Sequence, residues 1–560
     1  MHRCLLIDEL LRIIAYDLRQ DVYPVQRENS DLVNFILTCQ TFCEPGLDIL
    51  WDHLVDPLPL VHLFPNRYTL SPDCEESTRA TGEVIYDSDH DGLDSESSGD
   101  EEENSDGERS IQSASLSVRR QRIYDLTSIP TAAQWERFDY YARRIKRLDY
   151  ELDVYHPYLS KLAQGRVGRA LLPNLRCLLW NTTNVALFDH IQLFLPKTLI
   201  SLKVYGLTTK TSLRLLELLS ERQPSLEMFH FSHGNLDITH KEAITFSSLI
   251  SQYTNMRSLV VECHLNTFPI SKDALQALSM LPHLCRLWIE VDSELMDSSM
   301  PVHIDDSSKF PSLCHFTVIW RNNLSTRAVD TIIKSIHSRK LYSVLLYPRF
   351  AFVEANLVDI VSSLSHHTSL CMLRILHRDP MIYRHHAGTH STPIATKALI
   401  PLFRLSNLEI IVLEGCILDF TGSLIKDMAT SWPRLQNIRI KERNRICPDS
   451  RMDVLDLMHF ATQCPDIRDI SIPFYSDLAH AEDIPHCTLP DPDSTVVVDG
   501  TWADVGELMY TAAFLHTVFC KPHIRGHIGS RISGMGLREA RMWLTIRPND
   551  DGTIRWEERV

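Results

Sequence analysis

The sequence lacks the features that mark secreted, membrane-spanning or disulfide-stabilised proteins. Its 14 cysteines include no C-x-x-C pair, and their scatter suits reduced thiols in an apolar core. No run approaches the ~18 consecutive apolar residues of a membrane-spanning helix. The stretch 1–16 carries Asp8 and Glu9 and has no small-residue cleavage site, unlike a signal peptide. We therefore expect a soluble protein of the cytoplasm or nucleus that does not contact a membrane.

Signatures of catalysis are missing as well. The sequence contains no H-E-x-x-H zinc motif, no G-x-S-x-G nucleophile elbow and no glycine loop that ends in Lys-Ser/Thr. His385, His386 and His390 lie close together, but no acidic or cysteine partner stands at ligand spacing. We predict that the protein is not an enzyme and has no catalytic residues, metal site or cofactor.

Acidic residues outnumber basic ones, with 72 Asp and Glu residues against 56 Lys and Arg residues and a formal net charge of -16. Eleven acidic residues and no Lys or Arg fall within 87–108, so this segment carries most of the net charge. This charge argues against binding through phosphate neutralisation, and we expect no nucleic-acid partner. Abundant Ser, Asp, Glu and Gly with few aromatic residues predict a disordered acidic insert over 74–118.

Four serines of this insert have an acidic residue three positions on, as acidophilic-kinase sites do: Ser88, Ser97, Ser98 and Ser105. Phosphorylation would add roughly -1.5 to -2 charges at each. The insert is equally consistent with a solvated spacer that has no specific role.

Three helices are predicted within the first fifty or so residues. Apolar residues at steps of three and four mark an amphipathic helix over 5–18. Asn29, Ser30 and Asp31 provide an N-cap for a second helix over 32–42, and a third short helix ends at Trp51. So small a bundle cannot bury all of its apolar side chains, which predicts that it binds a partner.

The residues of these helices resemble an F-box. The matching segments are Leu6-Ile7-Asp8-Glu9-Leu10-Leu11, Leu32-Val33-x-Phe35-Ile36-Leu37-Thr38-Cys39-x-x-Phe42 and Glu44-Pro45-x-Leu47-Asp48-x-Leu50-Trp51. Their order and spacing are similar to those of basidiomycete-type F-box proteins. The resemblance implies that residues 1–65 form an F-box-like module that binds a Skp-type adaptor and, through it, a cullin ubiquitin ligase. We expect the adaptor to contact the apolar residues without an internal partner: Ile7, Leu10, Leu11, Ile14 and Leu37.

A six-residue unit, apolar-x-x-apolar-x-apolar, recurs eleven times with a mean spacing of about 29 residues. Its three anchors in each repeat are Leu175-Leu178-Trp180, Leu199-Leu202-Val204, Leu226-Phe229-Phe231, Met256-Leu259-Val261, Leu284-Leu287-Ile289, Leu313-Phe316-Val318, Leu341-Val344-Leu346, Leu370-Leu373-Ile375, Leu408-Ile411-Leu413, Leu435-Ile438-Ile440 and Ile467-Ile470-Ile472. Helical segments that end in a breaker precede many of them. Each unit is therefore a helix, a turn and a short strand.

Stacking of such units resembles the leucine-rich-repeat fold with long, ribonuclease-inhibitor-like repeats. We predict an α/β chain in which the F-box-like module is followed by an irregular leucine-rich-repeat horseshoe over 166–475, since most units lack the asparagine that usually follows the strand. A helical stripe from Trp135 to Leu148 predicts a helical cap and linker over 119–165. The end, 476–560, is expected to be a loop and cap with a hairpin of strands at 543–546 and 553–556.

Alternation along each strand places the residues between and just after the anchors on the concave face of the horseshoe. We predict that target protein binds there, through Tyr205, His230, Glu262, Trp288, Glu290, Tyr347, Arg374, Glu414, Arg439 and Lys441. The sequence thus favours the substrate-recognition subunit of a cullin-type ubiquitin ligase. The alternative is a non-catalytic leucine-rich-repeat scaffold whose N-terminal helices only cap the solenoid.

Overall fold

The computed structural model describes residues 7–19, 30–70, 123–151, 157–233, 240–263, 272–291, 309–320, 323–348, 354–376, 396–414, 421–441, 454–472, 496–502, 522–528, 543–548 and 554–559. The chain divides into two compact units, of which unit 1 is Met1–Leu199 and unit 2 is Ile200–Val560. None of the helices in these ranges combines the length and apolarity that crossing a bilayer requires.

Unit 1 opens with the three predicted helices, α1 (Asp8–Leu18), α2 (Ser30–Thr38) and α3 (Gln40–Leu50), which we call the helical module. Asp8 and Glu9 lie in the first turn of α1, where negative charge complements the helix dipole. Ala15, Leu32 and Ile36 form the centre of a small core shared by the three helices. The three predicted helices are therefore present, but the second ends at Thr38 rather than near 42, and the third begins at Gln40 and contains Pro45.

Helices α2 and α3 approach each other closely at Gly46. A Cβ atom added at Gly46 would overlap the side chain of Ile36, so glycine is what permits this approach. The rings of Phe35 and Phe42 stack beside it with their centroids 4.6 Å apart. The module thus has a tightly packed interior in spite of its size.

A short pairing of strands and an antiparallel pair follow the module. Strand β1 (His53–Leu54) and helix α4 (Leu58–Val61) lead to β2 (Arg67–Leu70), which pairs with β3 (Ile123–Leu126) so that Arg67 lies opposite Leu126 and Leu70 opposite Ile123. The predicted acidic insert 74–118 belongs to the segment between these two strands and lies outside the described residues.

The predicted helical stripe from Trp135 to Leu148 is wrong in its second half. Helix α6 (Ala132–Ala142) ends before it, and Arg147–Tyr150 form strand β4. Ile145, Leu148 and Tyr150 are completely buried and have the apolar-x-x-apolar-x-apolar spacing of a further repeat. The step of three between Ile145 and Leu148 fits both a helix and this repeat, which explains the misassignment.

Strands β1, β4 and β5 (Cys177–Asn181) pair in parallel and form the sheet of unit 1. Their register places Leu148 opposite Leu178 and Tyr150 opposite Trp180, whose rings stack at 4.4 Å. The remaining elements are α7 (Tyr158–Gly165), α8 (Val185–Phe188) and the 3-10 helix η3 (Ile191–Phe194).

Charged side chains tie the module to this sheet. The buried guanidinium of Arg144, just after α6, forms salt bridges with Glu44 and Asp48 of α3, and Arg12 of α1 also bonds to Asp48 at 2.8 Å. On the strands, His53 Nε2 lies 2.9 Å from the carboxylate of Asp149, which also accepts hydrogen bonds from Arg147. We call the salt bridges of Arg144 with Glu44 and Asp48 the Arg144 joint.

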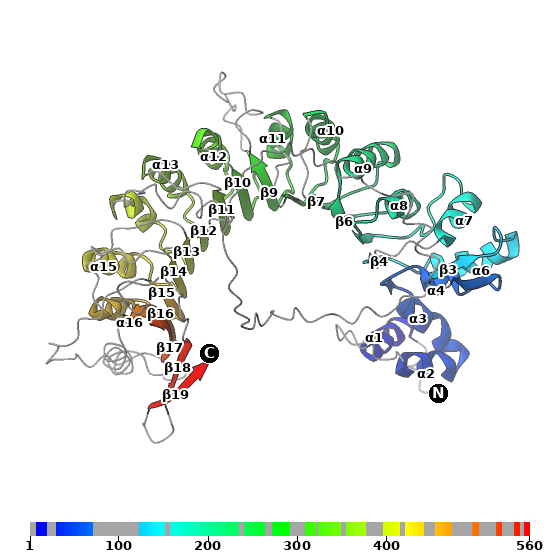
Figure 1. Cartoon of the computed structure of the whole chain (residues 1–560), viewed down its shortest axis with the longest axis horizontal. Coiled ribbons are helices and arrows are strands. Elements are labelled where there is room, and N and C mark those ends of the chain that lie inside the picture. Colours follow the sequence, from blue (N-terminus) through cyan, green and yellow to red (C-terminus); the bar gives the residue numbers. More distant parts are fainter. Residues whose placement is uncertain are drawn as a thin grey trace, which may run out of the picture. The chain divides into compact units, whose positions relative to one another are not determined.

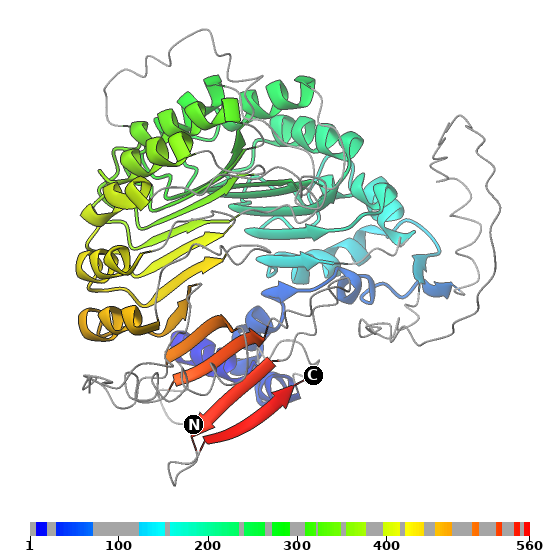
Figure 2. The same cartoon turned by 60° about the vertical axis from the view of Figure 1, so that its left-hand side comes forward.

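Unit 2 is a long sheet covered by helices on one face, as Figures 1 and 2 show. Its parallel strands are β6 (Ser201–Leu207), β7 (Met228–His233), β8 (Ser258–Cys263), β9 (Arg286–Val291), β10 (His315–Trp320), β11 (Ser343–Pro348), β12 (Met372–Ile375), β13 (Ile410–Glu414), β14 (Asn437–Lys441), β15 (Asp469–Ser471), β16 (Val496–Trp502) and β17 (Pro522–Ile528). The covering helices are α9 (Thr209–Arg222), α10 (His240–Ile250), α11 (Lys272–Ser279), α12 (Asn323–Ser335), α13 (Glu354–Leu364), η4 (Thr396–Arg404), α15 (Gly422–Ser431), η5 (Val454–Leu457) and α16 (Met458–Gln463).

The predicted anchors form the core between sheet and helices. Every anchor of the eleven units is at most 2% exposed. Pairing aligns equivalent anchors, so that Leu287 lies opposite Leu259 on one side and Phe316 on the other. The chain is therefore an α/β protein with N-terminal helices followed by leucine-rich-repeat-like units, as predicted.

The last part of the sheet departs from the prediction of a loop and cap. Strands β16 and β17 continue the parallel pairing beyond residue 475, with Val498 in register with Ile470 and Ile524. The predicted hairpin is present as β18 (Trp543–Pro548) and β19 (Ile554–Arg559), which pair antiparallel.

The contacts of Asp149 predict how unit 1 responds to acid. Burial raises the pKa of this carboxyl, but hydrogen bonds from His53 and Arg147 outweigh it and lower the pKa to about 2. Because this value lies below that of the unfolded chain, the ionised carboxylate stabilises the fold at neutral pH. That stability is lost as the pH falls from about 4 to about 2.

We expect Asp149→Asn to lower the free energy of unfolding at pH 7 by about 2 kcal/mol, with roughly half of this difference remaining at pH 3. Urea unfolding of both proteins at pH 7, 4 and 3 measures it. A difference that stays constant over this range would show that ionisation of Asp149 does not contribute.

Candidate functional site: two interaction surfaces

The helical module exposes a group of large apolar side chains. On α1 they follow helical spacing along one side, and on α2 they stand four residues apart. Their exposed fractions range from 37% at Ile14 to 75% at Leu37. We call this group the module face; it consists of Ile7, Leu10, Ile13, Ile14, Val33 and Leu37.

Four of the five predicted adaptor-binding residues belong to the module face, and Leu11 does not. Leu11 is 1% exposed and lies on the side of α1 that also carries the buried Ala15. The prediction that it lacks an internal partner is wrong, because positions four apart on a helix turn to the same side, and on this side of α1 both Leu11 and Ala15 are buried. Leu11 contributes to folding and is not accessible to an adaptor.

The module face also contains Ile13 and Val33, which the sequence analysis did not select. Ile13 is 57% exposed, next to Leu10 and Ile14 on the helix surface. Val33 stands one turn before Leu37 on α2. The spacing of these residues was a usable signal, because each lies three or four positions from a predicted contact.

The Arg144 joint fixes the module through α3 and leaves α1 and α2 with their apolar side chains exposed. Tyr140 donates a hydrogen bond to Glu44, and the guanidinium of Arg144 lies 4.6 Å from the centre of the Tyr140 ring. Hydrogen bonding from Tyr140 and then from Arg144 lowers the pKa of Glu44. Charged and polar contacts therefore hold α3, so the exposed apolar residues of α1 and α2 do not serve this attachment.

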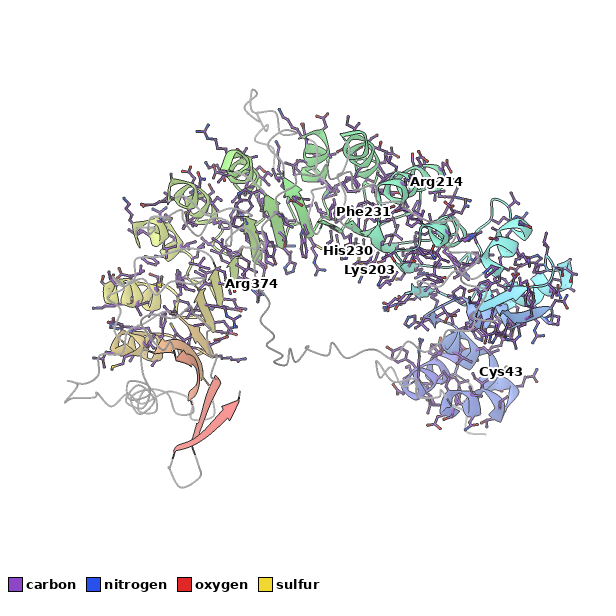
Figure 3. All side chains as sticks on the ribbon, in the orientation of Figure 1. Cys43, Lys203, Arg214, His230, Phe231 and Arg374 are labelled. Atoms are coloured by element: carbon purple, nitrogen blue, oxygen red, sulfur yellow. The ribbon has the colours of Figure 1, made fainter. Side chains whose placement is uncertain are left out.

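The second surface is the face of the unit 2 sheet that is turned away from the helices, which we call the strand face. In Figure 3, Lys203, His230 and Arg374 point to this side, whereas Phe231 points toward the helices. Pairing aligns its central row as Lys203, His230, Val260, Trp288, Thr317, Leu345, Arg374, Val412, Arg439 and Ser471.

Aromatic side chains gather in the middle of the strand face. The rings of Trp288 on β9 and Tyr347 on β11 are nearly parallel, with centroids 6.2 Å apart, and β10 lies between these strands. On β10, Thr317 and Ile319 are buried on this face. Half-buried Trp and Tyr side chains supply large, rigid contact areas and are typical of protein interfaces.

Polar groups flank this aromatic centre. Among the described residues, Trp288 Nε1 and Arg374 Nε are buried without a hydrogen-bond partner. Buried donors are usually paired in folded proteins, but these two atoms have no accessible surface through which a bound segment could reach them. Farther along, Arg439 bonds to Asp469 at 3.1 Å, and the hydroxyl of Tyr205 lies 3.2 Å from Nδ1 of His230.

The structure places the predicted target-binding residues on the strands, with one correction. Seven are half-buried: Tyr205, His230, Trp288, Tyr347, Arg374, Glu414 and Arg439. Glu290 is only 1% exposed, because it lies in register with the buried Ile319 in the crowded middle of the face, and it cannot contribute an exposed charge. Glu262 lies in β8 and Lys441 in β14, and the structure does not describe their side chains.

The described ranges contain no cluster of three His, Cys, Asp or Glu residues that could hold a metal ion. His385, His386 and His390 fall between 377 and 395 and lie outside these ranges.

Neither a protein-family model nor a curated protein matches the sequence. Solved structures do match, among them one described as the crystal structure of the Rad7 and Elc1 complex in yeast. This match has 15% identity and a TM-score of 0.29, and it covers 50% of this chain and 73% of the other. A likeness at this level supports no inference about function, so the fold assignment depends on the repeats and their pairing.

Because Leu11 is buried and Leu37 is exposed, we predict that substitution by alanine destabilises the protein strongly at Leu11 and hardly at all at Leu37. We expect Leu11→Ala to lower the free energy of unfolding by about 2–4 kcal/mol, because it leaves a cavity. Leu37→Ala should change it by no more than about 0.5 kcal/mol. Chemical unfolding followed by tryptophan fluorescence measures both, and equal losses would contradict the assigned faces.

Proposed function

We propose that this chain is the substrate-recognition subunit of a cullin-type ubiquitin ligase. The module face binds a Skp-type adaptor, and the strand face of unit 2 binds a target protein. The chain itself performs no covalent chemistry. It raises the effective concentration of the target at the ligase, which carries out the transfer.

The exposed module face is the observation that carries this proposal. Large apolar side chains are gathered on two short helices, and leaving such a group in water is unfavourable. A complementary apolar surface on an adaptor would remove it from water. The F-box resemblance of the three helical segments supports a Skp-type adaptor as the occupant of this surface.

The residue composition of the strand face supports the proposal that a target protein binds there. Trp288 and Tyr347 provide an aromatic anchor, and Arg374 provides a charged group beside it. Trp, Tyr and Arg are the residues that most often dominate the free energy of binding at protein interfaces. The open face of a repeat sheet is also the surface on which solenoid proteins usually bind partners.

The alternative is a leucine-rich-repeat scaffold whose N-terminal helices only cap the solenoid. A cap would bury the apolar side of its helices against the chain. Instead, α3 makes the polar attachment through the Arg144 joint, while Leu10 and Ile14 remain more than one-third exposed. This difference favours adaptor binding over capping alone.

Adaptor binding is tested with the full chain and a purified Skp-type adaptor in biolayer interferometry. We expect the double variant Leu10→Glu, Leu37→Glu to weaken binding at least about tenfold, because two charges are placed in an apolar interface. Val167→Glu is the matched control, since Val167 is an exposed apolar residue of unit 1 outside the module, and it should bind as the native chain does.

Circular dichroism and thermal unfolding should show that both proteins remain folded. If the native chain does not bind the adaptor, the ligase assignment fails and the scaffold reading stands. If the double variant binds as tightly as the control, the adaptor uses another surface.

A further inference from the structure

Two cysteines occupy the same position in consecutive repeats of unit 2. Cys285 follows the anchor Leu284, and Cys314 follows the anchor Leu313, each one residue before its strand. The backbone N–H of Cys314 donates to the carbonyl of Cys285 at 2.8 Å. The two residues are therefore direct neighbours across strands β9 and β10.

This position brings the two thiols within reach of one another. Neighbouring parallel strands are about 4.8 Å apart, and cysteines joined by a disulfide have Cα atoms roughly 4.4–6.8 Å apart. Both thiols are free and half-buried. Each donates only a weak hydrogen bond to a backbone carbonyl, Cys285 to Arg257 at 3.2 Å and Cys314 to Ser312 at 3.3 Å. Rotation about χ1 can turn both sulfur atoms toward each other.

We propose that Cys285 and Cys314 form a reversible redox modification site that closes to a disulfide in the presence of a small-molecule disulfide such as glutathione disulfide. One thiolate attacks a glutathione sulfur, forms a mixed disulfide and releases one glutathione thiolate. The second cysteine, as its thiolate, then attacks the protein sulfur and releases the second glutathione. Two protein thiols are oxidised to one disulfide, and one glutathione disulfide is reduced to two glutathione molecules.

The surroundings of Cys314 add a dependence on pH. Burial and then the neighbouring Cys285 raise the pKa of the Cys314 thiol, while Lys340 partly opposes this effect. Since the thiolate is the reactive form, closure should be faster at pH 8.5 than at pH 7.

The bond would be easily reversed. In-register positions on parallel strands keep Cβ atoms near the strand spacing of about 4.8 Å, beyond the roughly 3.5–4.5 Å of relaxed disulfides. A strained disulfide has a higher reduction potential and is a labile, regulatory one rather than a structural one. The bond would join the strands that carry Trp288 and Ile319, in the middle of the strand face.

A third cysteine provides an internal control. Cys371 occupies the equivalent position before β12. The equivalent residue before β11, which lies between β10 and β12, is Tyr342. Two strand spacings of about 10 Å separate Cys314 from Cys371, too far for a disulfide. The three cysteines share one kind of position and differ in whether a neighbouring strand carries a second thiol.

The experiment is peptide mapping of the full chain after reaction with glutathione disulfide and alkylation of the remaining thiols. Trypsin cuts after Lys272, Arg286, Lys309 and Arg321. Cys285 and Cys314 are then each the single cysteine of their peptides, 273–286 and 310–321. Mass spectrometry without reduction therefore identifies the cross-link unambiguously.

We expect the 285–314 cross-link to exceed any 314–371 cross-link at least roughly tenfold and to disappear on adding reduced glutathione. In Cys285→Ser, Cys314 should carry a glutathione adduct or remain a thiol. Separate glutathione adducts on Cys285 and Cys314 of the native chain, with no cross-link, would overturn the proposal. So would a 314–371 cross-link of equal yield.

Discussion

The in-register stacking of buried anchors is the interaction on which the rest of unit 2 depends. One repeat cannot bury its own apolar side chains, so each strand and helix is stable only against the equivalent residues of its neighbours. The backbone ladder then repeats the same alternation on every strand, with anchors facing the helices. Because the central positions stay in register from Lys203 of β6 to Ser471 of β15, residues that are far apart in sequence stand in one row on the strand face. The ordered placement of Trp288, Tyr347 and Arg374 is a consequence of core packing.

The helical module is held in place mainly by charged contacts and not by repeated apolar packing. Its core is closed by close approach at Gly46 and by a few side chains, and its attachment is made by Arg144, Glu44 and Asp48. Such contacts depend on geometry and charge, and they leave much of the apolar surface of α1 and α2 unused. The same hydrophobic effect that aligns the repeats therefore gives the module a tendency to associate. The anchors of unit 2 are buried inside it, whereas the apolar residues of the module face are exposed and available for another molecule.

The sequence predicts the repeating parts of this structure well, because the anchors recur with one spacing and every repeat tests the same pattern. It predicts single positions less well. Leu10 and Leu11 lie in adjacent apolar rows of one helix, and only the packing of α2 and α3 decides which row is buried. Ile145 and Leu148 have a spacing shared by helices and repeats. Glu290 is polar and alternates correctly, but its burial depends on neighbouring strands that its own segment does not specify.

The antiparallel pair β2–β3 has a consequence for the long segment between its strands. Leu70 and Ile123 lie opposite each other, so the segment from 71 to 122 leaves and rejoins the fold at a single place. The entropy of closing such a connection grows only logarithmically, by about 0.6 kcal/mol for each doubling of its length. A change in the length of this connection is therefore expected to alter the stability of the fold little. The β2–β3 pairing fixes both ends of the connection, so the rest of unit 1 does not depend on the length of the segment between them.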